Sequence, residues 1–386
     1  MIRGARLALL AVLLFAPLPA AAAKRASSRP AQPPAGAPPM TLKTLTPISE
    51  VPVTLTPAPF LIGMEDRFVV ATREGKLSAY GLHGGDALWK TDLERPLIAA
   101  PVALPGHLAV LFSGNEIALV DAGDGHVTAR AAGDGASGDT GSFLSALPTG
   151  LALASAAGSL RLIKPEDGAV LWDLKLSAPP AAAAADCGGR ILVGLKDGTL
   201  VSADPADGKT RWIKKLRAPL TTETLCVGNH AYVGSADNRL HALKIRKRGC
   251  RQRWTYLTGG DISGRPLFHE GRVIFSSYDT YLYALEADNG HLAWKVRLGR
   301  RPRPDNVIVG DLLLTAPLNT ERLEGFRLPA GTQAAALPLA SGKDRFVSPP
   351  ARAGAMVIIA AALYGDQASR VLVLDPTAQA PPTSAR

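Results

Sequence analysis

The residues best suited to chemistry are few and scattered. The chain has seven histidines and three cysteines, and none of them forms a group with the spacing of a zinc site. Residues 133–138 match the GxGxxG pattern, but they open no predicted helix and so do not indicate nucleotide binding. Asp121, Asp124, Asp134 and Asp139 could attract calcium, but they lack the spacing of a calcium loop and fit solvated turns better. We therefore assign no catalytic, cofactor-binding or metal-binding residue.

Basic residues form the pattern that stands out, in a chain of formal net charge +10. Two clusters follow predicted strands: Lys214, Lys215 and Arg217, and then Arg300, Arg301 and Arg303. A third cluster crowds one predicted hairpin: Lys244, Arg246, Lys247, Arg248, Arg251 and Arg253. We predict that the first two clusters bind an acidic protein partner, because a basic excess favours anionic partners. The alternative is that they are solvated loops that keep the protein soluble.

The elements that would position these clusters come from an internal repeat. All five tryptophans take the same place in a motif about 40 residues long, four or five residues after a turn glycine. They are Trp89, Trp172, Trp212, Trp254 and Trp294. Two further registers carry alanine at this place, Ala129 and Ala335, which gives seven.

Each repeat predicts short strands joined by tight turns. Residues 191–194 are apolar and precede a turn at Asp197–Gly198, and a second turn at Asp207–Gly208 precedes Trp212. Asp-Gly between apolar runs is a strong hairpin pattern, and no window has a helical period. Another strand before each such trio completes four, with candidates around Phe60, Val102, Leu147, Ala184, Leu225, Leu267, Val307 and Pro350.

This count predicts an all-β, eight-bladed propeller of four-stranded antiparallel blades. The eighth unit lacks a fourth strand, and residues 48–55 would supply it, so that the N-terminal strand closes the last blade. A seven-bladed ring is the alternative. Loops that follow a fourth strand leave one face of a propeller, whereas loops between third and fourth strands leave the other. The hairpin cluster should therefore lie on the face opposite to the two other clusters.

The runs Ala203 to Lys209 and Ala284 to Gly290, each leading to a tryptophan, resemble the repeat of the PQQ-like propeller family. This family includes the PQQ-dependent dehydrogenases and the propeller subunit of the outer-membrane barrel-assembly machinery, and the resemblance covers most of residues 48–376. It implies that the tryptophans pack between neighbouring blades. It also implies one of two functions, quinone-dependent oxidation or protein assembly. The dehydrogenases use adjacent cysteines, calcium-binding carboxylates and a catalytic aspartate, and this chain has no adjacent cysteines.

The N-terminal residues predict export, and the segments outside the repeats predict disorder. Residues 1–23 combine Arg3 and Arg6, an apolar stretch from Leu7 to Phe15 and a small-residue site at residues 20–23, as a signal peptide does. An uncleaved anchor is the alternative. We expect an Ala/Pro-rich disordered linker over residues 24–45, the propeller over 46–376 and a disordered tail over 377–386. No cysteine follows the apolar stretch, so we expect no lipid attachment there.

Cys187 and Cys226 lie at similar points of neighbouring repeats, so they form either a disulfide or a pair of buried apolar side chains. The function that we predict is a non-catalytic, monomeric periplasmic scaffold that binds protein, with outer-membrane protein assembly as the process. It would have no bound cofactor, no nucleic-acid partner and no membrane span in the mature chain. The alternatives are a PQQ-dependent oxidoreductase and a propeller that binds a ligand such as cell-wall polymer.

Overall fold

The computed structural model describes residues 43–54, 59–135, 141–317, 320–339, 344–363 and 368–377. The predicted signal peptide, the linker as far as residue 42, and the tail from residue 378 onward lie outside the described residues. No helix of the described chain has the length and apolar character needed to cross a membrane.

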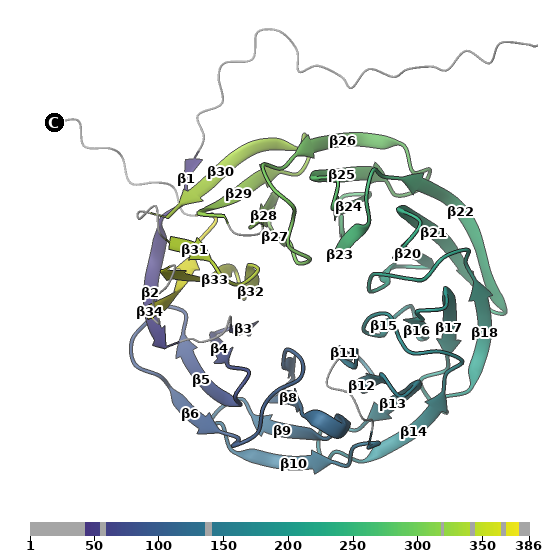
Figure 1. The fold of residues 1–386 in the computed structure, drawn as a ribbon, viewed down its shortest axis with the longest axis horizontal. Coiled ribbons are helices and arrows are strands. Elements are labelled where there is room, and N and C mark those ends of the chain that lie inside the picture. The colour runs from purple at the N-terminus through teal and green to yellow at the C-terminus, as the bar shows by residue number, and fades with distance from the viewer. Residues whose placement is uncertain are drawn as a thin grey trace, which may run out of the picture. The chain divides into compact units, whose positions relative to one another are not determined.

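Eight sheets surround a common centre as the blades of a propeller (Figure 1). Blade 1 contains β3 (Phe60–Gly63), β4 (Arg67–Ala71), β5 (Lys76–Gly81) and β6 (Trp89–Asp92). Blade 2 contains β7 (Val102–Leu104), β8 (His107–Leu111), β9 (Ile117–Asp121) and β10 (Val127–Ala131), with a 3-10 turn, η1, at Ser113–Asn115. Blade 3 contains β11 (Phe143–Leu147), β12 (Gly150–Ser155), β13 (Ser159–Ile163) and β14 (Val170–Lys175). Blade 4 contains β15 (Ala185–Asp186), β16 (Ile191–Gly194), β17 (Thr199–Ala203) and β18 (Thr210–Lys215).

The second half of the ring has the same plan. Blade 5 contains β19 (Leu225–Val227), β20 (His230–Ser235), β21 (Arg239–Arg246) and β22 (Gly249–Leu257). Blade 6 contains β23 (Ile262–His269), β24 (Arg272–Ser277), β25 (Tyr281–Glu286) and β26 (Leu292–Arg297). Blade 7 contains β27 (Val307–Val309), β28 (Leu312–Thr315), β29 (Arg322–Arg327) and β30 (Thr332–Pro338). Blade 8 contains β31 (Asp344–Phe346), β32 (Ala351–Ala353), β33 (Met356–Leu363) and β34 (Ala368–Leu374).

The N-terminal strand closes the ring, as the sequence predicts. β2 (Pro47–Thr54) runs antiparallel to β34 and forms the outer strand of blade 8. The eight-bladed prediction is therefore confirmed, and the seven-bladed alternative is wrong. The chain joins the propeller slightly earlier than expected, because β1 (Lys43–Thr44) pairs in parallel with β30 of blade 7. Leu45, which follows β1, is 2% exposed.

The core lies between neighbouring blades. The middle strands are packed on both sheet faces, so they are almost continuously apolar, and every residue of β16 and β17 is buried. The outer strand β18 is instead mostly exposed, with Trp212 buried and Lys214 partly buried between exposed side chains. This is why the repeat shows both runs of apolar residues and alternating patterns in the sequence.

Four of the tryptophans dock on the following blade in the same way. Each indole N–H donates a hydrogen bond of 2.8–3.1 Å to a backbone carbonyl in the next blade's 3–4 turn, the turn between third and fourth strands. The pairs are Trp89 with Ala122, Trp172 with Pro205, Trp254 with Ala287, and Trp294 with Leu328. The turn glycine lies against the indole, so a Cβ on Gly208 would come within 2.7 Å of the Trp172 ring. The inter-blade packing implied by the family resemblance is therefore present.

Trp212 departs from this arrangement. Its indole nitrogen is buried and has no hydrogen-bond partner among the described residues. The reason lies in blade 5, where only Lys247 and Arg248 separate β21 from β22. In blade 4 the corresponding turn spans residues 204–209, and in blade 6 it spans residues 287–291. The short turn of blade 5 places no carbonyl over Trp212.

A disulfide joins the same two blades. Cys187 follows β15 of blade 4 and Cys226 belongs to β19 of blade 5, and their Cα atoms are 5.3 Å apart. The structure thus selects the disulfide over two separate apolar side chains. Both cysteines pack in one cluster with Trp212, so a covalent link holds the junction that lacks the tryptophan hydrogen bond.

Candidate functional site

Lys214, Lys215 and Arg217 lie where β18 ends and the chain turns toward blade 5. Lys215 forms an ion pair of 3.0 Å with Asp197, which lies in the turn between β16 and β17. This turn and the loop after β18 therefore share one face of the propeller. The turn at Lys247 and Arg248 lies at the other end of the strands, which agrees with the predicted separation of the basic clusters.

A groove of about 510 Å³ opens beside these residues, between blades 4 and 5. Blade 4 contributes the end of β18 and the loop after it, and blade 5 contributes side chains of β21, β22 and the turn before β21. The lining residues are Lys214, Lys215, Leu216, Arg217, Asp237, Arg239, His241, Gln252 and Thr255. Four of these side chains are cationic and one is anionic, so the groove is suited to an anionic ligand.

Lys214 is the most informative residue of the groove. It lies two residues after Trp212 and is half-buried. The residue two after the tryptophan is Leu174 in blade 3, Tyr256 in blade 5 and Val296 in blade 6, and all three pack against apolar cores. In blade 1 it is Thr91, which donates a hydrogen bond of 2.6 Å to the Gly125 carbonyl. No ion pair to Lys214 occurs among the described residues, so its ammonium group is available to a ligand. Blade 4 therefore has a cation where blades 3, 5 and 6 have a side chain that packs against a core.

The other cations of the groove differ in how far they are neutralised. Lys215 is paired with Asp197, and Arg239 lies 3.7 Å from the Asp237 carboxylate. Arg217 is exposed and, among the described residues, has no ion pair. Lys214 and Arg217 are thus the two groups with positive charge available for a ligand.

His241 forms the buried wall of the groove and is 4% exposed. Its Nε2 lies 2.8 Å from the hydroxyl of Ser235 and 3.7 Å from Asp237. Burial lowers the pKa of His241, and the nearby Asp237 carboxylate partly offsets this effect. Ser235 is fully buried, and both groups face the same ring nitrogen, so the three residues do not form a nucleophilic triad.

The second predicted cluster lies elsewhere, after β26 in blade 6. Arg300 lines a separate pocket of about 180 Å³ that also contains Glu321, Glu324 and Arg345, so its charge is mixed. Arg301 lies 6.0 Å from the centre of the Tyr278 ring. The structure therefore does not bring the two predicted clusters into one groove.

Arg303 is used inside the molecule. Its guanidinium donates a hydrogen bond of 2.9 Å to the Phe346 carbonyl and a longer one of 3.5 Å to Val347. Burial lowers the pKa of Arg303. We therefore leave Arg303 out of the binding surface proposed below.

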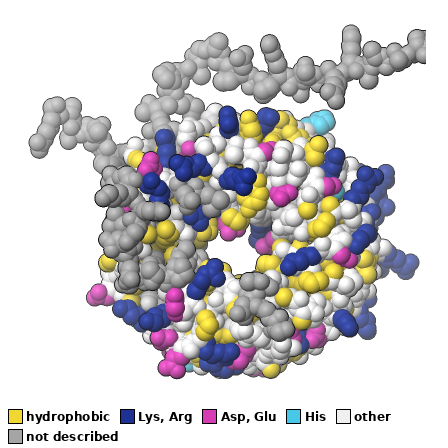
Figure 2. All heavy atoms as spheres, in the orientation of Figure 1, with side chains coloured by type: hydrophobic (Ala, Val, Ile, Leu, Met, Phe, Trp, Pro, Cys, Tyr) yellow, Lys and Arg dark blue, Asp and Glu magenta, His cyan; other side chains and the backbone are white. Residues whose placement is uncertain are grey.

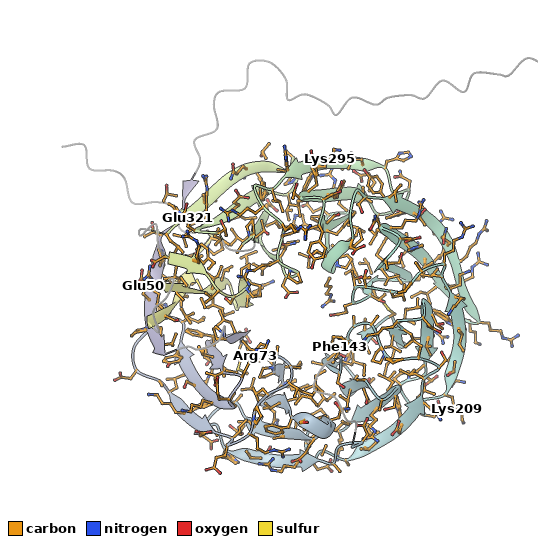
Figure 3. The ribbon with its side chains drawn as sticks, viewed as in Figure 1. Glu50, Arg73, Phe143, Lys209, Lys295 and Glu321 are labelled. Carbon is orange, nitrogen blue, oxygen red and sulfur yellow. A yellow bond between two sulfur atoms is a disulfide. The ribbon has the colours of Figure 1, made fainter. Side chains whose placement is uncertain are left out.

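A second hollow, of about 410 Å³, is lined by innermost strands around the centre of the ring. Figure 3 shows Arg73 and Phe143 beside the central opening, and Lys209 and Lys295 on the outer rim. Within the hollow, Glu223 forms an ion pair of 3.2 Å with Arg265. Burial raises the pKa of Glu223.

These groups do not fit the site of a quinone enzyme. Such a site needs carboxylates that are free to hold a divalent cation beside the quinone. Glu223 is neutralised by Arg265 instead, and Cys187 and Cys226 form their disulfide between two blades. We derive no reaction step through a quinone.

The aspartates considered for calcium do not act together. Asp121 and Asp124 lie with His126 in one turn, with ligand atoms within 4.8 Å of one another. Asp134 instead accepts a hydrogen bond of 2.8 Å from Asn115. Asp139 lies outside the described residues.

The sequence predicted three of the groove residues, Lys214, Lys215 and Arg217, and none of those from blade 5. Asp237, Arg239, His241 and Gln252 carry no recognisable motif, and only the fold places them opposite β18. The signal that could have found the groove is Lys214 itself, a lysine at a repeat position where Leu174 and Val296 are apolar.

The fold and the groove define an eight-bladed propeller with a basic groove between two blades. A family model described as outer membrane protein assembly factor BamB matches residues 49–191, 156–255 and 196–371. The chain therefore belongs to this BamB-like, PQQ-like propeller family. None of the curated proteins matches the chain.

Solved structures agree on the fold. The computationally designed Ika8 protein has a TM-score of 0.70 at 12% identity, over 83% of this chain and 98% of that chain. Sqt1 of Saccharomyces cerevisiae has a TM-score of 0.67 at 11% identity, over 86% of this chain and 99% of that chain. BamB from Moraxella catarrhalis has a TM-score of 0.48 at 16% identity, over 87% of this chain and 90% of that chain. At these identities the similarities to Ika8 and Sqt1 show the fold alone, and the similarity to the Moraxella BamB structure, whose TM-score is below 0.5, carries no argument.

Proposed function

We propose that this protein is a non-catalytic periplasmic scaffold for outer-membrane protein assembly, and that the groove between blades 4 and 5 binds an acidic segment of its partner. The observation that carries the proposal is Lys214. It is a half-buried cation in a groove, without an ion pair among the described residues, at a position where blades 3, 5 and 6 have side chains that pack against a core.

The chemistry of the groove suits a peptide that carries carboxylates. Lys214 and Arg217 supply the charge, and an arginine fork can hold a carboxylate through two parallel hydrogen bonds. Gln252 and Thr255 line the opposite side, where they can hydrogen-bond to peptide groups. His241 limits the depth of the groove, so an extended segment fits it better than a bulky side chain does.

Two observations support the periplasm as the place of action. Cys187 and Cys226 form a disulfide, and structural disulfides persist in oxidising compartments such as the periplasm. The first 23 residues have the charged, apolar and small-residue regions of a signal peptide. The family description adds outer-membrane protein assembly as the process.

Crosslinking in the native cells, followed by mass spectrometry, tests the proposal. The groove variant carries Lys214→Ser and Arg217→Ser and keeps Lys215, which is paired with Asp197. The control carries Lys175→Ser and Arg297→Ser, which remove two exposed cations from the outer strands of blades 3 and 6. Thermal unfolding of both variants checks that each is folded.

We expect the wild type and the control to capture a component of outer-membrane protein assembly. Loss of two charge pairs should reduce this capture at least tenfold in the groove variant. Equal capture by the groove variant and the control would overturn the assignment of the groove. If no assembly component is captured by the wild type, the scaffold function itself is wrong.

A further inference from the structure

The hairpin of β21 and β22 carries a second basic surface, at the other end of blade 5. Its exposed cations are Arg246, Lys247, Arg248, Arg251 and Arg253, which we call the basic hairpin. None of the five forms a salt bridge with a carboxylate of the described residues. Figure 2 shows Lys and Arg side chains gathered along the right-hand rim, where Figure 1 places the outer strands β18 and β22.

The basic hairpin interrupts the repeat on which the ring is built. In other blades the 3–4 turn covers the tryptophan of the preceding blade and accepts its N–H, as Pro205 does for Trp172. In blade 5 this turn is reduced to Lys247 and Arg248, and Trp212 has no such partner among the described residues. Local departures from an otherwise consistent pattern are typical of functional sites. In blade 5, a two-residue turn with two cations takes the place of the turn that would accept the Trp212 hydrogen bond.

We infer that the basic hairpin binds the surface of an anionic lipid bilayer. The chemical class is the phosphate of lipid headgroups. Four of the five cations are arginines, whose planar guanidinium donates two hydrogen bonds to one phosphate. None of the five cations lines the groove between blades 4 and 5, although Gln252, which lies between Arg251 and Arg253, does. The inference does not depend on the function proposed for that groove.

The shape of the basic hairpin favours a flat, extended partner. The tip is a two-residue turn between long strands, and none of its cations lines the groove beside Lys214 or the central hollow. Five exposed cations that line no groove suit an array of headgroups better than a single peptide segment. The aromatic residues of β22, Trp254 and Tyr256, pack against the core, so they offer no platform on which nucleic-acid bases could stack.

Cations on an outer strand also protect a sheet edge from aggregation with other molecules. The experiment must therefore distinguish protection against aggregation from binding to lipid headgroups. Protection against aggregation would show no dependence on lipid charge. Binding to headgroups should depend steeply on it, because each Lys or Arg near an anionic surface raises the partition coefficient roughly fivefold. This attraction should weaken as salt is added.

Vesicle co-sedimentation of the mature chain tests the inference. The probes are vesicles of pure phosphatidylcholine and vesicles in which about one third of the lipid is phosphatidylglycerol. The hairpin variant replaces Arg246, Lys247, Arg248, Arg251 and Arg253 by Ser. The control variant replaces five other exposed cations by Ser, which are Lys90, Lys175, Lys196, Arg297 and Arg327. The two variants have equal net charge, and light scattering reports the aggregation state of each.

We expect the wild type and the control to bind the anionic vesicles at low salt and to leave them at high salt. The hairpin variant should bind at least tenfold more weakly while it remains monodisperse and folded. Equal loss in both variants would show a general charge effect and would overturn the inference. So would failure of the wild type to bind, or a preference of the wild type for polyphosphate or an acidic peptide over the anionic vesicles in competition.

Discussion

The indole hydrogen bonds at the blade junctions lead to a prediction with an internal control. Trp89 and Trp212 are equally exposed, at 7%, and both pack in apolar clusters. Trp89 donates a hydrogen bond of 3.1 Å to the Ala122 carbonyl, whereas Trp212 has no acceptor among the described residues. Substitution of either residue by phenylalanine removes a similar part of the ring. Only Trp89→Phe also removes a hydrogen bond between blades.

The two variants should differ in free energy of unfolding by the net contribution of that hydrogen bond, about 1 kcal/mol. Unfolding entropy is about 2.1 cal/mol/K per residue, so 1 kcal/mol corresponds to roughly 1.5 °C in Tm for a propeller of this size. Trp89→Phe should therefore melt about 1.5 °C below Trp212→Phe in calorimetry under non-reducing conditions. Equal melting temperatures, or a lower one for Trp212→Phe, would refute the argument that the short turn of blade 5 leaves the Trp212 indole N–H without a carbonyl acceptor.

Two further predictions concern the junction of blades 4 and 5. Removing the disulfide with Cys187→Ser and Cys226→Ser should destabilise the protein by about 4 kcal/mol at most, from the loop entropy of 39 residues. Urea unfolding with and without reductant checks this, because reductant should lower the midpoint of the wild type and leave that of the double variant unchanged. Burial lowers the pKa of His241 below its unfolded value of about 6.5, so its contribution to stability is complete above that pH and is lost as pH falls toward the folded pKa. In urea unfolding at neutral and mildly acidic pH, His241→Gln should therefore lose less stability on acidification than the wild type does, and equal losses would contradict this role for His241.

Blades 4 and 5 carry both proposed surfaces, at opposite ends of their strands. The groove beside Lys214 lies toward Asp197 in the turn between β16 and β17, and the basic hairpin ends in the turn at Lys247 and Arg248. β21 pairs with β22 from Arg239, which lines the groove, to Arg246 at the turn, a length of about 23 Å. The two surfaces adjoin on β22, where Gln252 of the groove lies between Arg251 and Arg253 of the basic hairpin. A protein partner and a membrane surface could thus be bound together, and the disulfide at this junction would hold the two surfaces in a fixed relation.

Some of the candidate site was predictable from local sequence. Lys214, Lys215 and Arg217 were found because charges cluster after a strand, and the two-face argument needs only the order of strands in a blade. The internal role of Arg303 was not predictable in this way, because Arg303 lies in the loop between blades 6 and 7 and its guanidinium donates to the Phe346 carbonyl in blade 8. A contact between residues so far apart in the chain leaves no local pattern.

The sequence by itself determined the repeat and hence the ring. Turn residues such as Asp207–Gly208 and apolar runs such as residues 191–194 act over a few neighbours, so they can be recognised without the fold. The missing strand of the last unit also predicted closure by β2, because an open sheet edge is unfavourable. What only the tertiary structure decided are the contacts between blades. Packing between blades places His241 and Gln252 opposite Lys214 and brings Cys187 and Cys226 together in a disulfide. It also leaves the Trp212 indole N–H without a carbonyl acceptor among the described residues. They depend on how two separately folded sheets pack, and that packing brings together side chains whose spacing along the chain carries no signal.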